Sequence, residues 1–152
     1  MTVERIFTRS APAAASTEHS VVGVVAGSGI EGDRYFAHQD EPGQNVTFVE
    51  AEEIESFFTD QQRLADLSVF GRNVVTRGVR LNELVGVEFE VGTVRFKGVE
   101  LCEPCLGLGQ ALATATQPAA QVVKRLVGRA GLRADALSSG EVAVGAAINT
   151  AV

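Results

Sequence analysis

The sequence predicts a mainly β protein, a β-barrel with two or three short helices. Apolar residues alternate with Gly and Glu along 85–91 (VGVEFEV), the period-two pattern of a half-buried strand. Short β-branched runs recur along the chain, and many of its 16 glycines mark turns between them. The chain has 152 residues and no internal repeat, so we expect one domain over residues 1–152.

The first half of the chain alternates strand and turn signals. Residues 10–16 are rich in alanine and predict a loose connector. The run at 21–25 (VVGVV) predicts a strand, and the Gly-punctuated segment 29–34 after it predicts a loop. Residues 45–49 predict a second strand, and 51–58 predict a short helix whose apolar side chains share one side.

The second half follows the same pattern. Residues 70–76 predict a turn that leads into a strand. Because Gly92-Thr93 forms a turn signal after the alternating run, residues 94–101 predict its antiparallel return partner. Residues 119–127 predict a helix, with Pro118 suited to its first turn. The runs at 132–137 and 142–144 predict a closing hairpin.

Composition and charge restrict the class of protein. A net charge of −6 argues against nonspecific binding to nucleic acids or membrane surfaces, which favours basic proteins. No apolar run approaches the roughly 20 residues that span a bilayer. Residues 1–9 contain charges among their apolar positions and lack the apolar segment of a signal peptide, so we expect a cytoplasmic protein whose cysteines are thiols.

Both cysteines, Cys102 and Cys105, lie three residues apart at the end of the predicted return strand. A structural zinc site needs about four ligands, and only His19 and His38 remain to contribute, both distant in sequence. A thioredoxin-like redox pair belongs between a strand and a helix, whereas the pattern here predicts a hairpin. Two interpretations stay open: buried cysteines that act as small hydrophobes, and a reactive or metal-ligating thiol.

Four further residues are candidates for a site because they lie in Gly-marked loops. Arg34 and Arg72 can bind an anionic group, with Asp33 orienting Arg34 and Asn73 fixing a loop or donating to a ligand. The alternatives are a turn aspartate, surface arginines and an asparagine that satisfies backbone groups.

Six segments, in order and spacing, resemble the MOSC domain, the C-terminal domain of molybdenum cofactor sulfurases that also occurs as stand-alone bacterial proteins. The segments are 29–34 (GIEGDR), 44–50 (QNVTFVE), 71–78 (GRNVVTRG), 84–92 with its leading LVG, Pro104-Cys105, and 131–145, which ends in GEVAVG. The chain departs from the family pattern at Ala146, where relatives usually carry an acidic residue.

The resemblance implies a MOSC-like barrel that binds molybdenum cofactor (molybdopterin), carries sulfur, or does both. Cys105 matches the family's cysteine, which is proposed to carry sulfur or coordinate molybdenum. Some relatives are thought to reduce N-hydroxylated compounds; here an electron-donor protein would be needed, because no flavin or iron–sulfur motif is present. Pyridoxal phosphate, a family-level association, has no evident binding motif in this chain.

From the resemblance and the charge pattern together, we expect Arg34, Arg72, Asn73 and Cys105 to line one pocket. A protein of a different class remains the alternative: a noncatalytic interaction domain on the same barrel, with inert buried cysteines.

Overall fold

The structure is a computed structural model that describes residues 1–38 and 41–151. Its strands are β1 (Thr2–Thr8), β2 (Thr17–His19), β3 (Val21–Val25), β4 (Gly29–Ile30), β5 (Val46–Glu50), β6 (Val74–Arg77), β7 (Glu88–Val91), β8 (Val94–Leu101), β9 (Leu132–Ala136), β10 (Gly140–Ala143) and β11 (Ile148–Asn149). Its helices are α1 (Ala51–Asp60), α2 (Leu106–Leu112), α3 (Ala119–Leu126) and the short 3₁₀ helix η1 (Leu81–Leu84). The prediction of a mainly β fold with two or three short α-helices is therefore confirmed.

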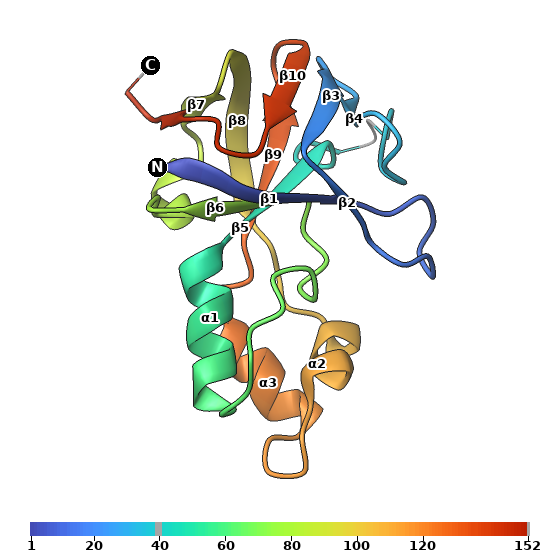
Figure 1. The fold of residues 1–152 in the computed structure, drawn as a ribbon, viewed down its shortest axis with the longest axis vertical. Helices are drawn as coiled ribbons and strands as arrows, with labels where there is room; N and C mark the ends of the chain where they lie inside the picture. The colour runs from blue at the N-terminus through green and yellow to red at the C-terminus, as the bar shows by residue number, and fades with distance from the viewer. Residues whose placement is uncertain (39–40, 152) are drawn as a thin grey trace.

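Eight strands form one curled sheet in the order β11-β7-β8-β9-β5-β6-β1-β2. Only β5 and β6 run parallel, because helix α1 lies between them in the chain. The N-terminal end of β1 bonds to the segment before β11: Val3 N donates to Ala146 O (3.0 Å), and Ile148 N donates to Met1 O (2.9 Å). The β11 end of the sheet therefore approaches β1, giving the barrel-like form (Figure 1).

A second, three-stranded sheet lies beside the first in the order β10-β3-β4. Alternate residues of both sheets point inward and form one apolar core, in which Phe48, Phe89 and Phe96 contact one another at ring-centroid distances of 5.2–5.8 Å. These rings are 0–1% exposed, which makes the barrel interior a packed core.

The three α-helices gather at one end of the barrel (Figure 1). A second apolar cluster joins them to the outer side of the sheet, where Ile54, Phe57 and Phe58 of α1 pack with Leu112 and Leu126. No helix in the described part of the chain is long and apolar enough to cross a membrane.

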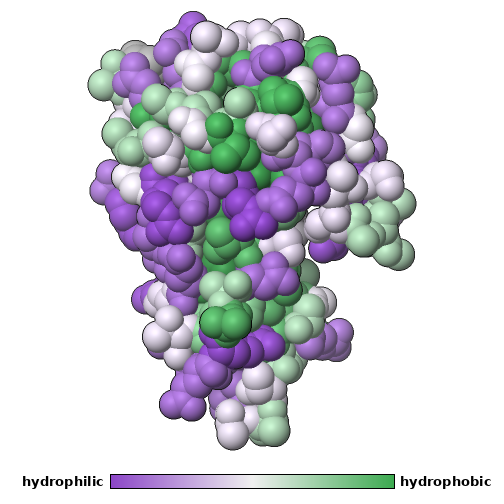
Figure 2. Space-filling model, viewed as in Figure 1, coloured by the Kyte–Doolittle hydropathy of each residue, from purple (hydrophilic) through white to green (hydrophobic). Residues whose placement is uncertain are grey.

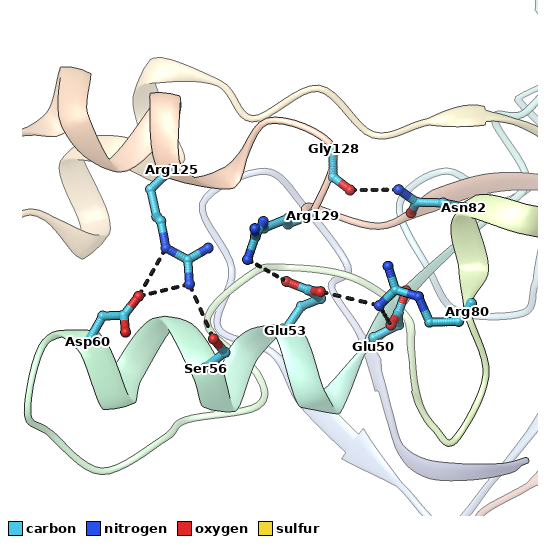
Figure 3. A network of polar contacts seen from close by, with 9 residues as sticks. All are labelled: Glu50, Glu53, Ser56, Asp60, Arg80, Asn82, Arg125, Gly128 and Arg129. Atoms are coloured by element: carbon cyan, nitrogen blue, oxygen red, sulfur yellow. Dashed lines mark hydrogen bonds and ion pairs between the residues drawn. The ribbon is translucent and has the colours of Figure 1, made fainter.

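Polar contacts tie the helices to η1 and to the loop after α3 (Figure 3). Glu53 on α1 pairs with Arg80 (3.4 Å) and Arg129 (3.6 Å), and Arg80 also pairs with the buried Glu50 (2.9 Å). The Glu50 carboxylate accepts a hydrogen bond from Leu81 N (3.1 Å), yet burial raises the pKa of this side chain above the ordinary value.

Glycine is required where β9 begins beside β5. Gly131 has φ +113°, and a Cβ placed there would collide with the carbonyl oxygen of Phe48. The absence of a side chain lets the two backbones approach closely just before Leu132 pairs with Phe48.

Several local predictions were wrong in ways that long-range pairing explains. The proposed hairpin of 132–144 does not exist: β9 pairs with β8 and β5, whereas β10 pairs with β3. The strand predicted over 85–91 begins only at Glu88, because residues 81–84 form the 3₁₀ helix and a turn follows it. Within the predicted loop 29–34, Gly29–Ile30 is strand β4, which pairs with β3.

Candidate functional site

A pocket of about 400 Å³ opens where several strands end on the helix-facing side of the sheet. Its wall comes from the C-terminal end of β1, the loop after β4, the start of β5, the loop before β6 and the end of β8. Arg133 on β9 completes it. The alanine-rich loop after β1, whose Ser16 also lines the pocket, projects from the body of the molecule at the right of Figure 2.

Asn73 connects three of these segments and is 7% exposed. Its Nδ2 donates to Phe7 O (3.1 Å) and to Asp33 Oδ1 (3.2 Å). Its Oδ1 accepts from both the backbone N and the hydroxyl of Thr47, each at 3.1 Å. Because these hydrogen bonds occupy both the donor and the acceptor of the side-chain amide, Asn73 acts as a positioning residue that joins β1, β5 and the loop after β4.

Asp33 anchors the loop after β4 and is 8% exposed. Its carboxylate accepts hydrogen bonds from the backbone N of Arg9 (3.1 Å) and of Tyr35 (3.2 Å), in addition to the one from Asn73. The backbone N of Arg34 donates to Arg9 O (2.7 Å). Asp33 thus orients Arg34 through the backbone of its loop, and places Arg9 and Arg34 next to each other.

Most arginines of this chain are neutralised by a carboxylate, and those at the pocket are the main exceptions. Seven of the eleven arginines form ion pairs: Arg5, Arg77, Arg80, Arg95, Arg125, Arg129 and Arg133. Among residues 1–38 and 41–151, the four without one are Arg9, Arg34, Arg63 and Arg72, and all of these except Arg63 line the pocket.

Each unpaired pocket arginine is held by a neutral group. The guanidinium of Arg34 lies over the ring of Tyr35, 4.6 Å from its centroid. Arg72 donates from Nε to Ala130 O (2.8 Å), and Arg9 donates from Nε to Ser16 Oγ (3.3 Å). The terminal nitrogens of all three donate to no residue in the described part of the chain, so they remain able to bind a ligand.

Cys102 is the cysteine in the pocket wall, and it is 5% exposed. Its backbone N donates to Gly131 O (2.8 Å), which fixes it beside the start of β9. Burial raises the pKa of the Cys102 thiol, whereas the positive charges of Arg72 and Arg133 oppose that rise. An anionic or metal-bearing ligand in the pocket would lie within the same electrostatic environment as this thiol.

Cys105 is exposed and is not among the residues that line the pocket. It immediately precedes α2, and its Sγ accepts a hydrogen bond from Leu108 N (3.4 Å). The cysteine loop therefore runs from a strand to a helix, and the predicted hairpin context was wrong.

The two thiols do not form a disulfide in this arrangement. Residues 102–105 contain neither a turn nor a bend, and burial alternates along them, with Cys102 and Pro104 inside and Glu103 and Cys105 outside. Three extended steps separate Cα atoms by roughly 10 Å, which is beyond the limit of about 7 Å for a disulfide.

The structure thus brings together four of the five candidate residues: Asp33, Arg34, Arg72 and Asn73. It adds two arginines, Arg9 and Arg133, and the other cysteine, Cys102. Arg9 was missed because β1 was not predicted as a strand, so its end was not expected at a site. The histidines lie outside the pocket lining: His19 bonds to the hydroxyl of Thr8 (2.7 Å) and His38 packs edge-on against Tyr35.

The family model for the MOSC domain matches residues 36–149. The chain therefore belongs to the MOSC domain family, a family linked to molybdenum cofactor binding. No curated protein sequence was found to match it.

Solved structures agree in fold. The YuaD protein from Bacillus subtilis superposes with a TM-score of 0.82 at 18% identity, covering 97% of this chain and 94% of that one. YiiM from Geobacillus stearothermophilus gives 0.75 at 16% identity, covering 99% of this chain and 75% of that one. YiiM from Escherichia coli gives 0.69 at 16% identity, with coverages of 100% and 70%. At these identities the likeness establishes the fold alone.

Proposed function

We propose that this chain binds a phosphate-bearing molybdenum cofactor, molybdopterin, in the pocket. The observation that supports this most strongly is the distribution of charge. In a chain of net charge −6, three of the four arginines without a described ion-pair partner line one cavity. An anionic group that enters there would gain charge-assisted hydrogen bonds from side chains that have no competing carboxylate of their own.

The residues present fit such a group. Arg9, Arg34 and Arg72 would hold its phosphate, while Asp33 and Asn73 keep their loops in place. Molybdenum accepts soft sulfur ligands, and the chain offers Cys102 in the pocket wall and Cys105 just beyond it. When bound, the cofactor supplies redox chemistry that no side chain of this protein provides.

The family motif assigns the metal-ligating or sulfur-carrying role to Cys105, and we retain that assignment as a proposal. Cys105→Ser should then abolish molybdenum retention, whereas Cys102→Ser should leave most of it. Because Cys102 is the thiol that lines the pocket, the opposite ranking would assign the metal to Cys102. Equal loss in both variants would point instead to a dithiol pair, and undiminished retention in both would favour inert cysteines.

The experiment that tests the cofactor proposal measures molybdenum and pterin in gently purified protein. Arg34→Gln and Arg72→Gln should each weaken retention by about 1.5–3 kcal/mol, roughly 10- to 150-fold. Arg63→Gln is the matched control, because Arg63 also lacks an ion pair with any described residue but lies outside the pocket lining. Equal molybdenum in all four proteins would contradict the assignment, and absence of molybdenum and pterin from the wild type would favour a noncatalytic interaction domain.

A second candidate function, sulfur carriage, is favoured by the exposure of Cys105. An exposed thiol with an N–H donor at 3.4 Å is accessible to a protein or small-molecule sulfur donor. The Cys105 thiolate would attack the outer sulfur of a donor persulfide, gaining that sulfur atom as the donor leaves as a thiol. Mass spectrometry after treatment with glutathione persulfide should find an added 32 Da on Cys105; labelling confined to Cys102 would contradict it.

Reduction of N-hydroxylated compounds remains a prediction from the family resemblance. It would require an electron-donor protein as partner. Reduction of benzamidoxime by the molybdenum-loaded protein, with a chemical reductant in place of the donor, would support it, and no product with loaded protein would exclude that substrate.

A further inference from the structure

The fourth arginine of the pocket, Arg133, differs from the other three because it is already paired. Its Nη1 contacts Glu100 Oε1 at 2.6 Å, and both residues line the pocket. The pairing arises from the sheet: an irregularity in the β8–β9 register between Gly98 and Glu100 sets Glu100 opposite Arg133. The ion pair is therefore built into the backbone alignment of the two strands.

The two partners are not equally fixed. The Arg133 side chain is 29% exposed, and its Nε also donates to Gly43 O (3.2 Å), whereas the Glu100 side chain is 55% exposed and has no other hydrogen bond in residues 1–38 and 41–151. Exposed ion pairs stabilise proteins little, because water screens them and both side chains lose rotational freedom. Glu100 can therefore swing away while Arg133 stays in place.

Charges at the pocket are closely balanced. Four arginines, Arg9, Arg34, Arg72 and Arg133, face three carboxylates. Of these carboxylates, Asp33 is buried and fully engaged by hydrogen bonds, while Glu100 and Glu103 lie at the exposed rim. Loss of the Glu100 charge would double the nominal excess of positive charge from one to two.

We propose that Arg133 is a fourth anion-binding residue and that Glu100 competes with the ligand for it, so that a ligand gains the Arg133 contact only by displacing Glu100, and a phosphate dianion gains more from that exchange than a single carboxylate does. This inference rests on the proposed anion-binding function of the pocket. A monoanion that displaces Glu100 replaces one carboxylate by another and gains little. A phosphate dianion brings a second charge and a third oxygen, and so binds Arg133 while keeping its contacts to the unpaired arginines.

The test compares phenyl phosphate with benzoate, which share a ring and differ in charge, by calorimetric titration at pH 8 and low ionic strength. Wild-type protein should prefer phenyl phosphate. Glu100→Gln should tighten phenyl phosphate binding at least about 5-fold and benzoate binding by no more than that, because removing a nearby negative charge favours the dianion more. Glu103→Gln is the matched control, because it removes a charge from the same rim without releasing an arginine, and it should tighten the binding of either probe less than Glu100→Gln does.

The double variant Glu100→Gln/Arg133→Gln should lose the gain, with thermal unfolding used to confirm that each variant is folded. A gain that persists without Arg133, or an equal effect of the Glu100 and Glu103 substitutions, would overturn the inference. If Arg34→Gln weakens phenyl phosphate binding while Glu100→Gln changes nothing, only this inference fails. If no protein binds either probe, the anion-binding function of the pocket fails with it.

Discussion

Substitution of Asn73 by alanine should destabilise the whole fold, although Asn73 lies at the pocket. The substitution removes two hydrogen bonds donated by Nδ2 and two accepted by Oδ1. It leaves the carbonyl of Phe7, the carboxylate of Asp33 and the backbone N of Thr47 with fewer partners. Each buried polar group left unpaired costs about 1–3 kcal/mol. Because the pocket admits some water to these groups, we expect a loss of about 3–5 kcal/mol in the free energy of unfolding.

Urea denaturation followed by circular dichroism measures this loss, with the slope of the transition checked for a change in the unfolded state. Asn82→Ala is the control: Asn82 is exposed, and within residues 1–38 and 41–151 its side chain makes a single hydrogen bond, to Gly128 O (2.9 Å). The loss for this variant should therefore stay within about 1 kcal/mol. A loss for Asn73→Ala no larger than for Asn82→Ala would refute the assignment of Asn73 as a positioning residue.

The substitution Asn73→Asp tests the hydrogen-bond donor of the Asn73 side chain separately from its acceptor. The aspartate keeps the Oδ1 acceptor but replaces the Nδ2 donor, which lies 3.2 Å from Asp33 Oδ1, with a second carboxylate oxygen. Repulsion should destabilise the variant at pH 7 and lessen as acidification protonates one of the two carboxylates. Urea denaturation at pH 7 and at pH 4 measures the free energy of unfolding of the variant relative to wild type. If the deficit of the variant is as large at pH 4 as at pH 7, the contact between residue 73 and Asp33 is contradicted.

Three further outcomes follow from single contacts. Gly131→Ala should lower the free energy of unfolding by at least about 2 kcal/mol, because φ is +113° and the new methyl group would collide with the Phe48 carbonyl. Urea denaturation measures this loss, and no loss would contradict the close approach of β5 and β9. Burial raises the pKa of Glu50, so its contribution to stability is fully present below the ordinary glutamate pKa and is lost as pH rises through the raised value. Wild type should therefore lose stability relative to Glu50→Gln between pH 4 and pH 7, and a pH-independent difference would exclude the shift. Iodoacetamide should modify the exposed Cys105 before Cys102. The buried Cys102 thiol has a raised pKa and should react appreciably only at alkaline pH or in urea. The reverse order of modification would contradict the placement of the two cysteines.

The sequence by itself determined the elements whose signal is local. The strands predicted at 21–25 and 45–49 and the helix predicted at 51–58 lie at 21–25, 46–50 and 51–60 in the structure, because β-branched runs and apolar residues repeated on one face are local signals. The mainly β class and the MOSC resemblance were also evident in the chain, as was the choice of Arg34 and Arg72, because glycine-marked loops and arginine chemistry are properties of short segments.

Only the tertiary structure decided which strands pair and which side chains meet. β9 and β10 are neighbours in sequence but belong to different sheets, because each forms its backbone hydrogen bonds with strands more than 30 residues away. The same long-range pairing sets Glu100 opposite Arg133, brings Arg9 to Arg34, and places Cys102 rather than Cys105 in the pocket wall. Such contacts depend on register and burial across the whole barrel, and no single segment contains that information.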